Sequence, residues 1–328
     1  MIPRTPTVSV VICTHNRSAD VKIALSSLLD QKGWQNEDEI IVVDNASRDK
    51  TREVVELAAI DGSSMGIKVK YLYERKIGLS HARNTGYKSA NNSIVIYLDD
   101  DAKPVGEWLM SMRSPFKEEH VGAVGGPIMP LFEIAPPSWL GSDFAVRDIG
   151  IEGPLSGLSA RTGFAGGNMA IRKMMIHELG GFDVNLGMKG SGLAFGEETD
   201  FFTRLYRHYG NVTYFSKGAV VLHKEPAFKQ EINYVIQRLF YIANLFPAHA
   251  VAGYGVPVGL VLSLSKVVKQ LALGLGYGVS SFLGKGYVFK CLRGMVTAAG
   301  VFWGIARLFA VKDRGGEREV LSDEHVSP

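Results

Sequence analysis

The chain has 328 residues, of which 46% are hydrophobic and 21% are charged, and its formal net charge is +3. This composition excludes a largely disordered chain, and so small a net charge gives no support for a nucleic-acid-binding protein. The chain has only two cysteines, Cys13 and Cys291, which excludes a disulfide framework and favours a reducing compartment. Residues 1–6 lack the apolar core of a signal peptide, so we expect the first domain to stay in the cytoplasm.

Strand and helix patterns alternate through the first hundred residues. Strands are expected at Val8–Cys13, Glu39–Asp44, Val69–Tyr73 and Ile94–Leu98, and helices from Ser18 to about Leu29, at Thr51–Ile60 and at Leu79–Ala90. Such alternation predicts βαβ units with right-handed crossovers and a mostly parallel sheet. In sheets of this kind the ligand binds beyond the carboxyl ends of the strands.

Polar residues follow three of these expected strands: Thr14–Arg17, Asp44 with Asn45, and Asp99–Asp101. We expect them to meet at one edge of the sheet. Three adjacent carboxylates repel one another unless a cation neutralises them, and hard oxygen ligands suit Mg²⁺ or Mn²⁺. The pattern therefore predicts a divalent-metal site that holds a diphosphate, and the alternative for these residues alone is a solvated acidic turn.

The turn after the first strand excludes a dinucleotide-binding Rossmann half. That fold needs a G-x-G-x-x-G turn, whereas residues 14–18 read Thr-His-Asn-Arg-Ser and contain no glycine. No G-x-x-x-x-G-K-[ST] sequence follows any expected strand either. A nucleotide is therefore expected to be held through a metal ion and side chains.

Past Pro104 the alternation is less regular. We expect a helix at Trp108–Phe116, a strand with a turn at Gly122–Met129 and a long loop at residues 133–163, rich in Pro, Gly and Ser. Within that loop, Trp139 is a candidate platform for stacking against a sugar, although packing is the favoured interpretation. A loop of this length inside a compact domain is usually functional or mobile.

Six short segments, in this order, resemble the inverting glycosyltransferases of family 2, which have the GT-A fold. They are Val8–Arg17, Ile41–Thr51, Gly78–Gly86, Tyr97–Ala102, Gly166–Arg172 with Gly181–Asp183, and Gly196–Leu205. The resemblance covers about the first 225 residues. It implies an α/β GT-A catalytic domain at 1–230, with a mostly parallel central sheet flanked by helices.

The resemblance assigns donor-binding roles near the first strands. Asp44 is expected to hydrogen-bond the nucleotide base, with uracil as the expected base, and Thr14 and Asn16 line the same pocket. Arg17 is expected close to the diphosphate. Asn84 lies in a segment that crosses the donor, or alternatively braces its own helix.

The three carboxylates Asp99, Asp100 and Asp101 match the D-x-D element of the family. Asp101 is the expected metal ligand together with Asp99, and Asp100 is expected nearer the ribose. His223, at the end of the apolar segment Val220–Leu222, is a candidate metal or diphosphate ligand, with a structural role as the alternative. The cation, Mg²⁺ or Mn²⁺, would stabilise the departing nucleoside diphosphate.

The second acidic cluster is expected to supply the general base. Acidic residues at a helix start are ordinary complements to its dipole, but an inverting transfer also needs one carboxylate to take the proton of the acceptor hydroxyl. The family usually has Glu-Asp here, with Asp as the base, whereas this chain has Glu197 and Glu198. Glu198 takes the base position by register, and Asp200 is the fallback.

Gly166, Gly167 and Asn168 are expected on the acceptor side. Two glycines allow the backbone to approach a sugar closely, and a plain β-turn is the alternative. Gln237 and Arg238 do not match the Q-x-x-R-W element of processive members, which favours the addition of a single sugar.

The last third of the chain changes in composition. Three apolar runs at Ala250–Ser265, Leu271–Leu283 and Met295–Ala306 fall short of the roughly 20 residues of a spanning helix. Lysines and arginines between them suit helices that lie in a membrane interface, and a helical subdomain packed on the catalytic core is the alternative. We expect an apolar, membrane-associating helical region at 231–312 and a disordered tail at 313–328.

These observations predict a metal-dependent inverting glycosyltransferase at the cytoplasmic face of the cell membrane, peripheral or shallowly inserted. It would move a sugar from a nucleotide-sugar, with UDP expected, to a hydroxyl of a glycan or lipid-linked glycan in polysaccharide biosynthesis. A nucleotidyltransferase is one alternative, but it would need a glycine- and lysine-rich loop after the first strand. A non-catalytic sugar- or nucleotide-binding protein on the same fold is the other, but it should have lost one acidic cluster.

Overall fold

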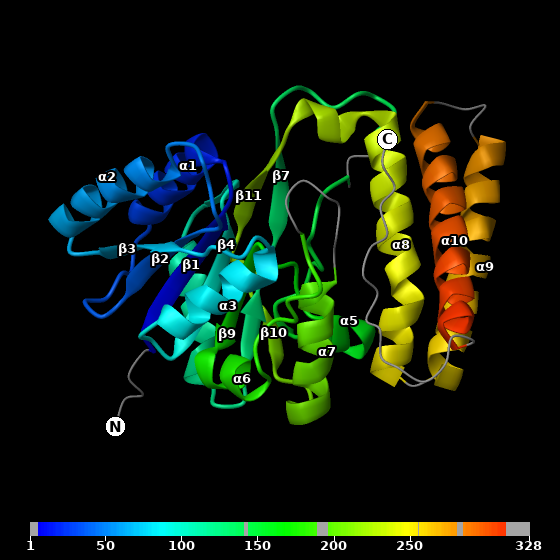
Figure 1. Cartoon of the computed structure of the whole chain (residues 1–328). Helices are drawn as coiled ribbons and strands as arrows, with labels where there is room; N and C mark the ends of the chain where they lie inside the picture. The colour runs from blue at the N-terminus through cyan, green and yellow to red at the C-terminus, as the bar shows by residue number, and fades with distance from the viewer. Residues whose placement is uncertain (1–5, 141–143, 189–195, 255, 281–284, 313–328) are drawn as a thin grey trace.

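The computed structural model describes residues 6–140, 144–188, 196–254, 256–280 and 285–312. An eight-stranded sheet has the order β3-β2-β1-β4-β9-β6-β10-β8, and a three-stranded sheet has the order β5-β11-β7. Helices cover both faces of the large sheet, and three long helices stand beside it (Figure 1). The predicted tail at 313–328 lies outside the described residues.

The first half of the chain forms the parallel part of the large sheet. Its elements are β1 (Val8–Thr14), α1 (Ser18–Leu29), β2 (Glu39–Asp44), α2 (Thr51–Ser64), β3 (Lys68–Tyr73), α3 (Leu79–Ser89) and β4 (Ile94–Asp99). β1 pairs in parallel with both β2 and β4, so that Thr14 lies opposite Asp44 and Cys13 opposite Asp99. The predicted alternation is confirmed, and the three polar strand ends lie side by side.

The second half adds shorter elements to both sheets. They are β5 (Ala102–Pro104), α4 (Trp108–Arg113), the 3₁₀ helix η1 (Ser114–Lys117), β6 (Ala123–Gly125), β7 (Ile128–Phe132), β8 (Gly153–Pro154), α5 (Gly157–Thr162), β9 (Asn168–Arg172), α6 (Lys173–Glu178), α7 (Glu197–Tyr209), β10 (Thr213–Phe215), β11 (Val221–Glu225) and the 3₁₀ helix η2 (Ala227–Gln230). β9 runs antiparallel to β4 and β6, with Asn168 opposite Leu98. This pairing brings the Gly166–Gly167 turn to the end of β4.

The expected strand at Gly122–Met129 is two strands that belong to different sheets. β6 joins the large sheet and β7 joins the small one, where it pairs with β11. The chain crosses between them at Gly126, where a side-chain Cβ would lie 2.1 Å from the carbonyl oxygen of Ala219. The expected loop at 133–163 likewise contains β8 and α5. The short strands β6, β7 and β8 were missed because their pairing partners are distant in sequence.

Two apolar layers enclose the large sheet. One layer joins the sheet to α1, α2 and α4, with Leu25, Leu28 and Trp108 fully buried. The other joins it to α3, α6 and α7, where Phe182 stacks on Phe201 with ring centroids 4.7 Å apart. Packing on both faces fixes the direction in which the strand ends point, and so positions the site.

Three helices follow the small sheet: α8 (Ile232–Tyr254), α9 (Val256–Ser280) and α10 (Lys285–Lys312). They pack against one another, and α8 also contacts α5 and α7. α9 and α10 approach closely at Gly294, where a Cβ would lie 2.8 Å from the carbonyl oxygen of Gln270. Among the described residues, no helix combines the length and apolarity needed to cross a bilayer.

Candidate active site

The structure brings Asp99, Asp101 and His223 together at the end of β4. One ligand atom from each lies within 4.8 Å of the others. His223 Nε2 is 3.0 Å from Asp101 Oδ1 and 3.6 Å from Asp99 Oδ2. The antiparallel pairing of β5 with β11 places His223 opposite Ala102, next to Asp101. All three predicted metal-site residues therefore meet, although 122 positions separate Asp101 from His223.

The chemistry of this trio fits a divalent cation. Burial lowers the pKa of His223, but hydrogen bonds and the charges of Asp101 and Asp99 outweigh that effect and raise it to about 10. The two carboxylates thus favour the protonated imidazole, which indicates that the electrostatic potential at this point is negative and favours a cation. Carboxylate oxygens and an imidazole nitrogen are donors that Mn²⁺ and related divalent ions accept.

Arg17 lies beside the same cluster, at the start of α1. Its Nη1 atom donates to Asp100 Oδ1 at 3.1 Å and to Asp101 Oδ2 at 2.9 Å. Asp100 is buried, and burial together with the charge of Asp101 raises its pKa to about 7. A guanidinium in this position can contact phosphate oxygens beside a bound metal.

The predicted base pocket lies at the ends of β1 and β2. Asp44 is buried, and it accepts hydrogen bonds from the Tyr71 hydroxyl at 2.7 Å and the Ser47 backbone N–H at 2.8 Å. Asn16 has a positive φ of 54°, and its backbone N–H donates to Ser47 Oγ at 2.8 Å. Thr14 is buried opposite Asp44. These bonds hold the β1–α1 and β2–α2 loops together.

Both polar atoms of the Asn84 side chain form hydrogen bonds with the backbone of Phe182. Its Nδ2 donates to the carbonyl oxygen of Phe182 at 2.8 Å, and its Oδ1 accepts from the Phe182 N–H at 2.9 Å. The side chain therefore braces the turn at Gly181–Phe182 against α3. Of the two roles expected for Asn84, the structure displays the bracing one.

The second acidic cluster is held by a buried arginine, Arg83, which sequence reasoning missed as a site residue. Arg83 Nη1 donates to Glu197 Oε1 at 3.0 Å and Arg83 Nη2 donates to Glu198 Oε1 at 3.1 Å. Arg83 is 2% exposed and also lies over the Phe182 ring. The only local signal was its place in the segment Gly78–Gly86, because its partners lie more than a hundred residues away.

The glycine pair lies between the two acidic clusters. A Cβ on Gly166 would be 2.2 Å from Glu198 Oε1, and a Cβ on Gly167 would be 2.1 Å from Asp99 Oδ2. No side chain larger than hydrogen fits at either position without movement of these groups. The two clusters therefore flank one short turn, rather than lying on opposite sides of the molecule.

Glu197 and Glu198 differ in exposure. The Glu197 side chain is 3% exposed, whereas that of Glu198 is 20% exposed and can reach a ligand. Burial and the charge of Glu198 raise the pKa of Glu197 to about 8, despite the nearby Arg83. Of the two side chains, that of Glu198 is the more exposed.

The fallback base, Asp200, has a structural partner. It forms an i,i+4 ion pair with Arg204 at 2.8 Å. Arg204 in turn donates to the carbonyl oxygens of Leu179 and Gly181. This network fastens α7 to the turn after α6.

Two further residues predicted on the acceptor side are engaged within the protein. Asn168 is 1% exposed, donates to the carbonyl oxygens of Pro127 and Ala219, and accepts from Trp108 Nε1 at 2.8 Å. Trp139 is partly buried and packs against an apolar cluster that includes residues of α8. Both side chains tie segments of the fold together, and packing was the favoured interpretation for Trp139.

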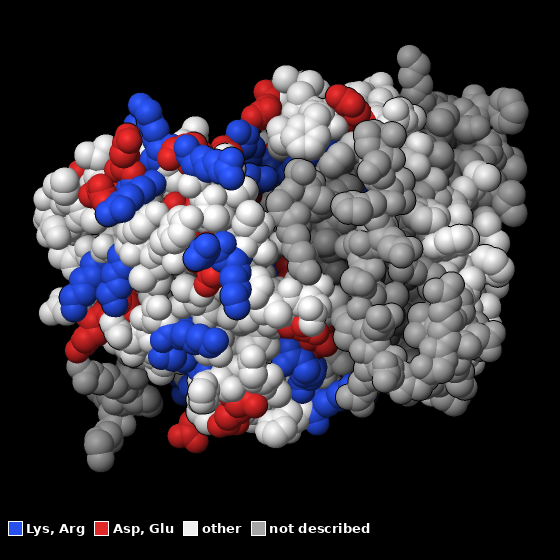
Figure 2. Space-filling model, viewed as in Figure 1, with Lys and Arg blue, Asp and Glu red and all other residues white. Residues whose placement is uncertain are grey.

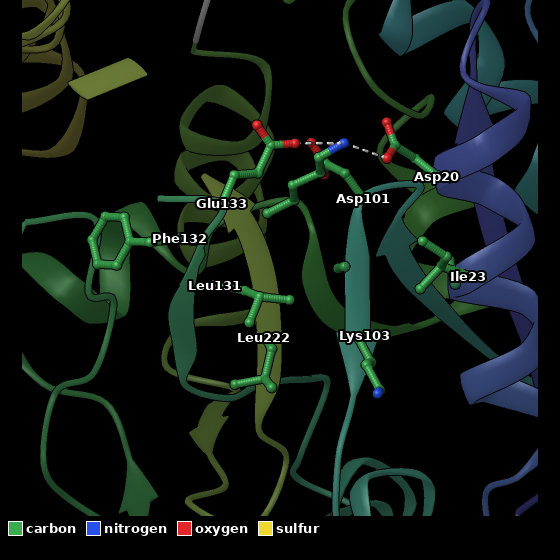
Figure 3. Close-up of a pocket in the computed structure, with 11 residues that line it drawn as sticks. Asp20, Ile23, Asp101, Lys103, Leu131, Phe132, Glu133 and Leu222 are labelled. Carbon is green, nitrogen blue, oxygen red and sulfur yellow. Dashed lines mark hydrogen bonds and ion pairs between the residues drawn. The ribbon is translucent and has the colours of Figure 1, made fainter. Parts of the chain in front are cut away.

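An apolar pocket of about 290 Å³ opens beside the metal-site trio, between α1 and the small sheet (Figure 3). Ile23, Leu131 and Leu222 line it, and Asp101 lies at its edge. Lys224 also lines the pocket and joins Asp20 to Glu133, with Nζ 2.9 Å from Asp20 Oδ1 and 3.1 Å from Glu133 Oε1. The backbone N–H of Lys224 also donates to the Asp101 carbonyl oxygen, so this ion-pair bridge adjoins the trio.

Comparison with known proteins identifies a family. The profile described as "Glycosyl transferase family 2" matches residues 9–180, slightly more than half of the chain. A glucosyl-dolichyl phosphate glucuronosyltransferase of Haloferax volcanii is 25% identical over 247 residues, covering 71% of this chain and 74% of that protein. The succinoglycan biosynthesis protein ExoM of Rhizobium meliloti is 28% identical over 204 residues, covering 61% of each.

Solved structures share the fold at low identity. The mannosyltransferase PcManGT of Pyrobaculum calidifontis, in complex with GDP-Man and Mn²⁺, aligns with a TM-score of 0.60 at 18% identity and covers 92% of this chain and 87% of that one. Residues 1–349 of Staphylococcus aureus TarS, in complex with UDP-GlcNAc, align with a TM-score of 0.52 at 16% identity, covering 75% of this chain and 66% of that one. The predicted GT-A fold is thereby confirmed.

Proposed function

Because this chain belongs to glycosyl transferase family 2, and is therefore a glycosyltransferase, we propose that it moves a sugar with inversion from a nucleotide-sugar to a hydroxyl of a lipid-linked glycan. A single observation carries the proposal. The trio Asp99, Asp101 and His223 and the carboxylate Glu198 flank the Gly166–Gly167 turn. With the departing diphosphate at the trio and the general base at Glu198, the acceptor hydroxyl could attack the sugar from the side opposite the leaving group, as an inverting transfer requires.

On the donor side, the chain offers groups for each part of a nucleoside diphosphate. Asp99, Asp101 and His223 would hold Mg²⁺ or Mn²⁺, and the cation would neutralise charge on the departing diphosphate. Arg17 adds a guanidinium beside the same point. Asp44, buried at the end of β2, would accept a hydrogen bond from the base, which we propose to be uracil.

On the acceptor side, Glu198 would take the proton of the attacking hydroxyl. Arg83 holds one of its oxygens at 3.1 Å, which fixes the carboxylate while leaving part of it exposed. The raised pKa of the neighbouring Glu197 favours its neutral form and so reduces the negative charge beside Glu198. We therefore assign the role of general base to Glu198 and not to Glu197.

The acceptor class is supported by two relatives. One is named for its action on glucosyl-dolichyl phosphate and one for succinoglycan biosynthesis. We propose that this chain likewise works on a lipid-linked glycan in polysaccharide assembly, at the cytoplasmic face of the membrane.

Isothermal titration with UDP and with GDP, each with and without Mn²⁺, tests the donor half of the proposal. We expect UDP to bind at least tenfold more tightly with Mn²⁺ than without it. A screen of UDP-sugars for slow hydrolysis then identifies the donor. Equal binding of UDP with and without the cation, together with no hydrolysis of any nucleotide-sugar, would refute the proposal.

A further inference from the structure

Among the described residues after Gln230, most of the exposed large apolar side chains lie on α9 and α10. On α9, Val258, Val261, Leu264, Val268 and Leu271 are each between 45% and 67% exposed. Their spacing of three or four residues places them on one face of the helix. A soluble surface rarely leaves so regular a stripe of large apolar side chains in water.

α10 carries a second stripe. Met295, Phe302 and Trp303 are 56%, 64% and 56% exposed, and the spacing from Met295 to the aromatic pair is again that of one helix face. The buried positions of α10 are small residues such as Gly294 and Ala298. α10 therefore packs partly through small residues, with Val301 also fully buried, and leaves these three large side chains exposed.

The charge of this region identifies the partner. Residues 232–312 contain none of the 33 Asp and Glu residues of the chain. They contain eight cationic residues: Arg238, Lys266, Lys269, Lys285, Lys290, Arg293, Arg307 and Lys312. In Figure 2, blue and red side chains are spread over the catalytic part, whereas the described surface of α9 and α10 is white in that view. Apolar stripes in an exclusively cationic segment complement an anionic lipid surface.

We propose that the α9–α10 face, defined by Val258, Val261, Leu264, Val268, Leu271, Met295, Phe302 and Trp303, docks onto the surface of an anionic lipid bilayer. The apolar stripes enter the boundary between headgroups and acyl chains, and Trp303 lies at the headgroup level, where tryptophan is favoured. Lys269 is exposed beside the α9 stripe, within reach of lipid phosphates. This surface is separate from the catalytic site, so the inference holds whatever sugar the protein transfers.

Vesicle sedimentation of the full chain tests the proposal. The probes are vesicles of phosphatidylcholine alone and of phosphatidylcholine with about one third phosphatidylglycerol. We expect binding to the anionic vesicles that is at least tenfold stronger than to the neutral ones. The double variant Val261→Asp with Val268→Asp should lose at least tenfold of that binding, because two charges would enter the apolar boundary.

A matched control comes from α2, where Leu57 and Ile60 are 63% and 65% exposed. Leu57→Asp with Ile60→Asp adds the same charge at equal exposure on the catalytic domain and should bind vesicles like the unchanged protein. Circular dichroism and UDP titration of both variants separate loss of folding or of the proposed function from loss of docking. In the unchanged protein, Trp303 emission should shift to the blue on anionic vesicles, and Trp303→Phe should remove most of that shift.

Three results would overturn the inference. One is an absence of binding to anionic vesicles. Another is equal binding by both double variants. The third is a lipid-free dimer, seen by light scattering, that only the α9 variant dissociates, because a second copy of the chain would then cover this face.

Discussion

Replacing Glu198 with glutamine should strongly reduce the rate of sugar transfer, whereas replacing Glu197 with glutamine should change it little. Glu198→Gln removes the proposed general base, whereas Glu197→Gln replaces a group whose pKa of about 8 keeps it largely protonated at pH 7. Glutamine resembles a protonated glutamate in shape and in having a neutral head. The pair therefore tests which carboxylate accepts the proton, with nearly identical chemistry at adjacent positions.

The expected magnitudes follow from the geometry. Burial and the charge of Glu198 raise the pKa of Glu197 and favour its neutral form, which glutamine resembles, so Glu197→Gln should change kcat less than about threefold. A positioned general base contributes about 10² to 10⁴ in rate, so Glu198→Gln should lower kcat by that factor, or ~3–5 kcal/mol in barrier height. Arg83 retains an oxygen acceptor in either variant, so the fold should persist.

The assay is transfer from the UDP-sugar identified by the hydrolysis screen, with UDP affinity measured by titration on the same preparations. UDP affinity should stay within about twofold in both variants, since among the described residues no hydrogen bond or ion pair joins either glutamate to Asp99, Asp101 or His223. If Glu197→Gln loses transfer while Glu198→Gln keeps it, the assignment of the base is reversed. If both keep it, neither is the base and the reasoning from exposure and ionisation fails.

Three further predictions concern the metal trio, the glycine turn and stability. His223→Gln should lower Mn²⁺ affinity at least ~10-fold, read by paramagnetic resonance, whereas His120→Gln, at an exposed position, should leave it unchanged. Gly167→Ala places a Cβ 2.1 Å from Asp99 Oδ2 and should cost about 1–3 kcal/mol of unfolding free energy together with Mn²⁺ affinity; unaltered melting and Mn²⁺ binding would contradict the contact. The pKa of Glu197 is raised from 4.5 to about 8, so the folded state holds its proton more tightly than the unfolded state does. That contribution to stability is complete below pH 4.5 and is lost as the pH rises through 8, so Glu197→Gln should flatten the decline in denaturant midpoint between those values.

The sequence by itself determined the parallel core and the three polar strand ends. β1, β2 and β4 are short, apolar and separated by helix-forming segments, and each of these properties is local. Parallel pairing then obliges Asp44 and Asp99 to lie at the same edge as Thr14, because crossover connections leave no other arrangement. The six short segments that resemble the family are also local in sequence, so they could be recognised without the structure.

Only the tertiary structure decided which side chains face one another within that edge. Arg83 reaches Glu197 and Glu198 across more than a hundred residues, and His223 reaches Asp101 through a strand pairing that no local pattern encodes. The side-chain amide of Asn168 likewise forms hydrogen bonds with three segments that are distant in sequence, at Trp108, Pro127 and Ala219. Sequence periodicity reports which residues are buried, but the choice of partner depends on strand order and register, which are set by the packing of the whole chain.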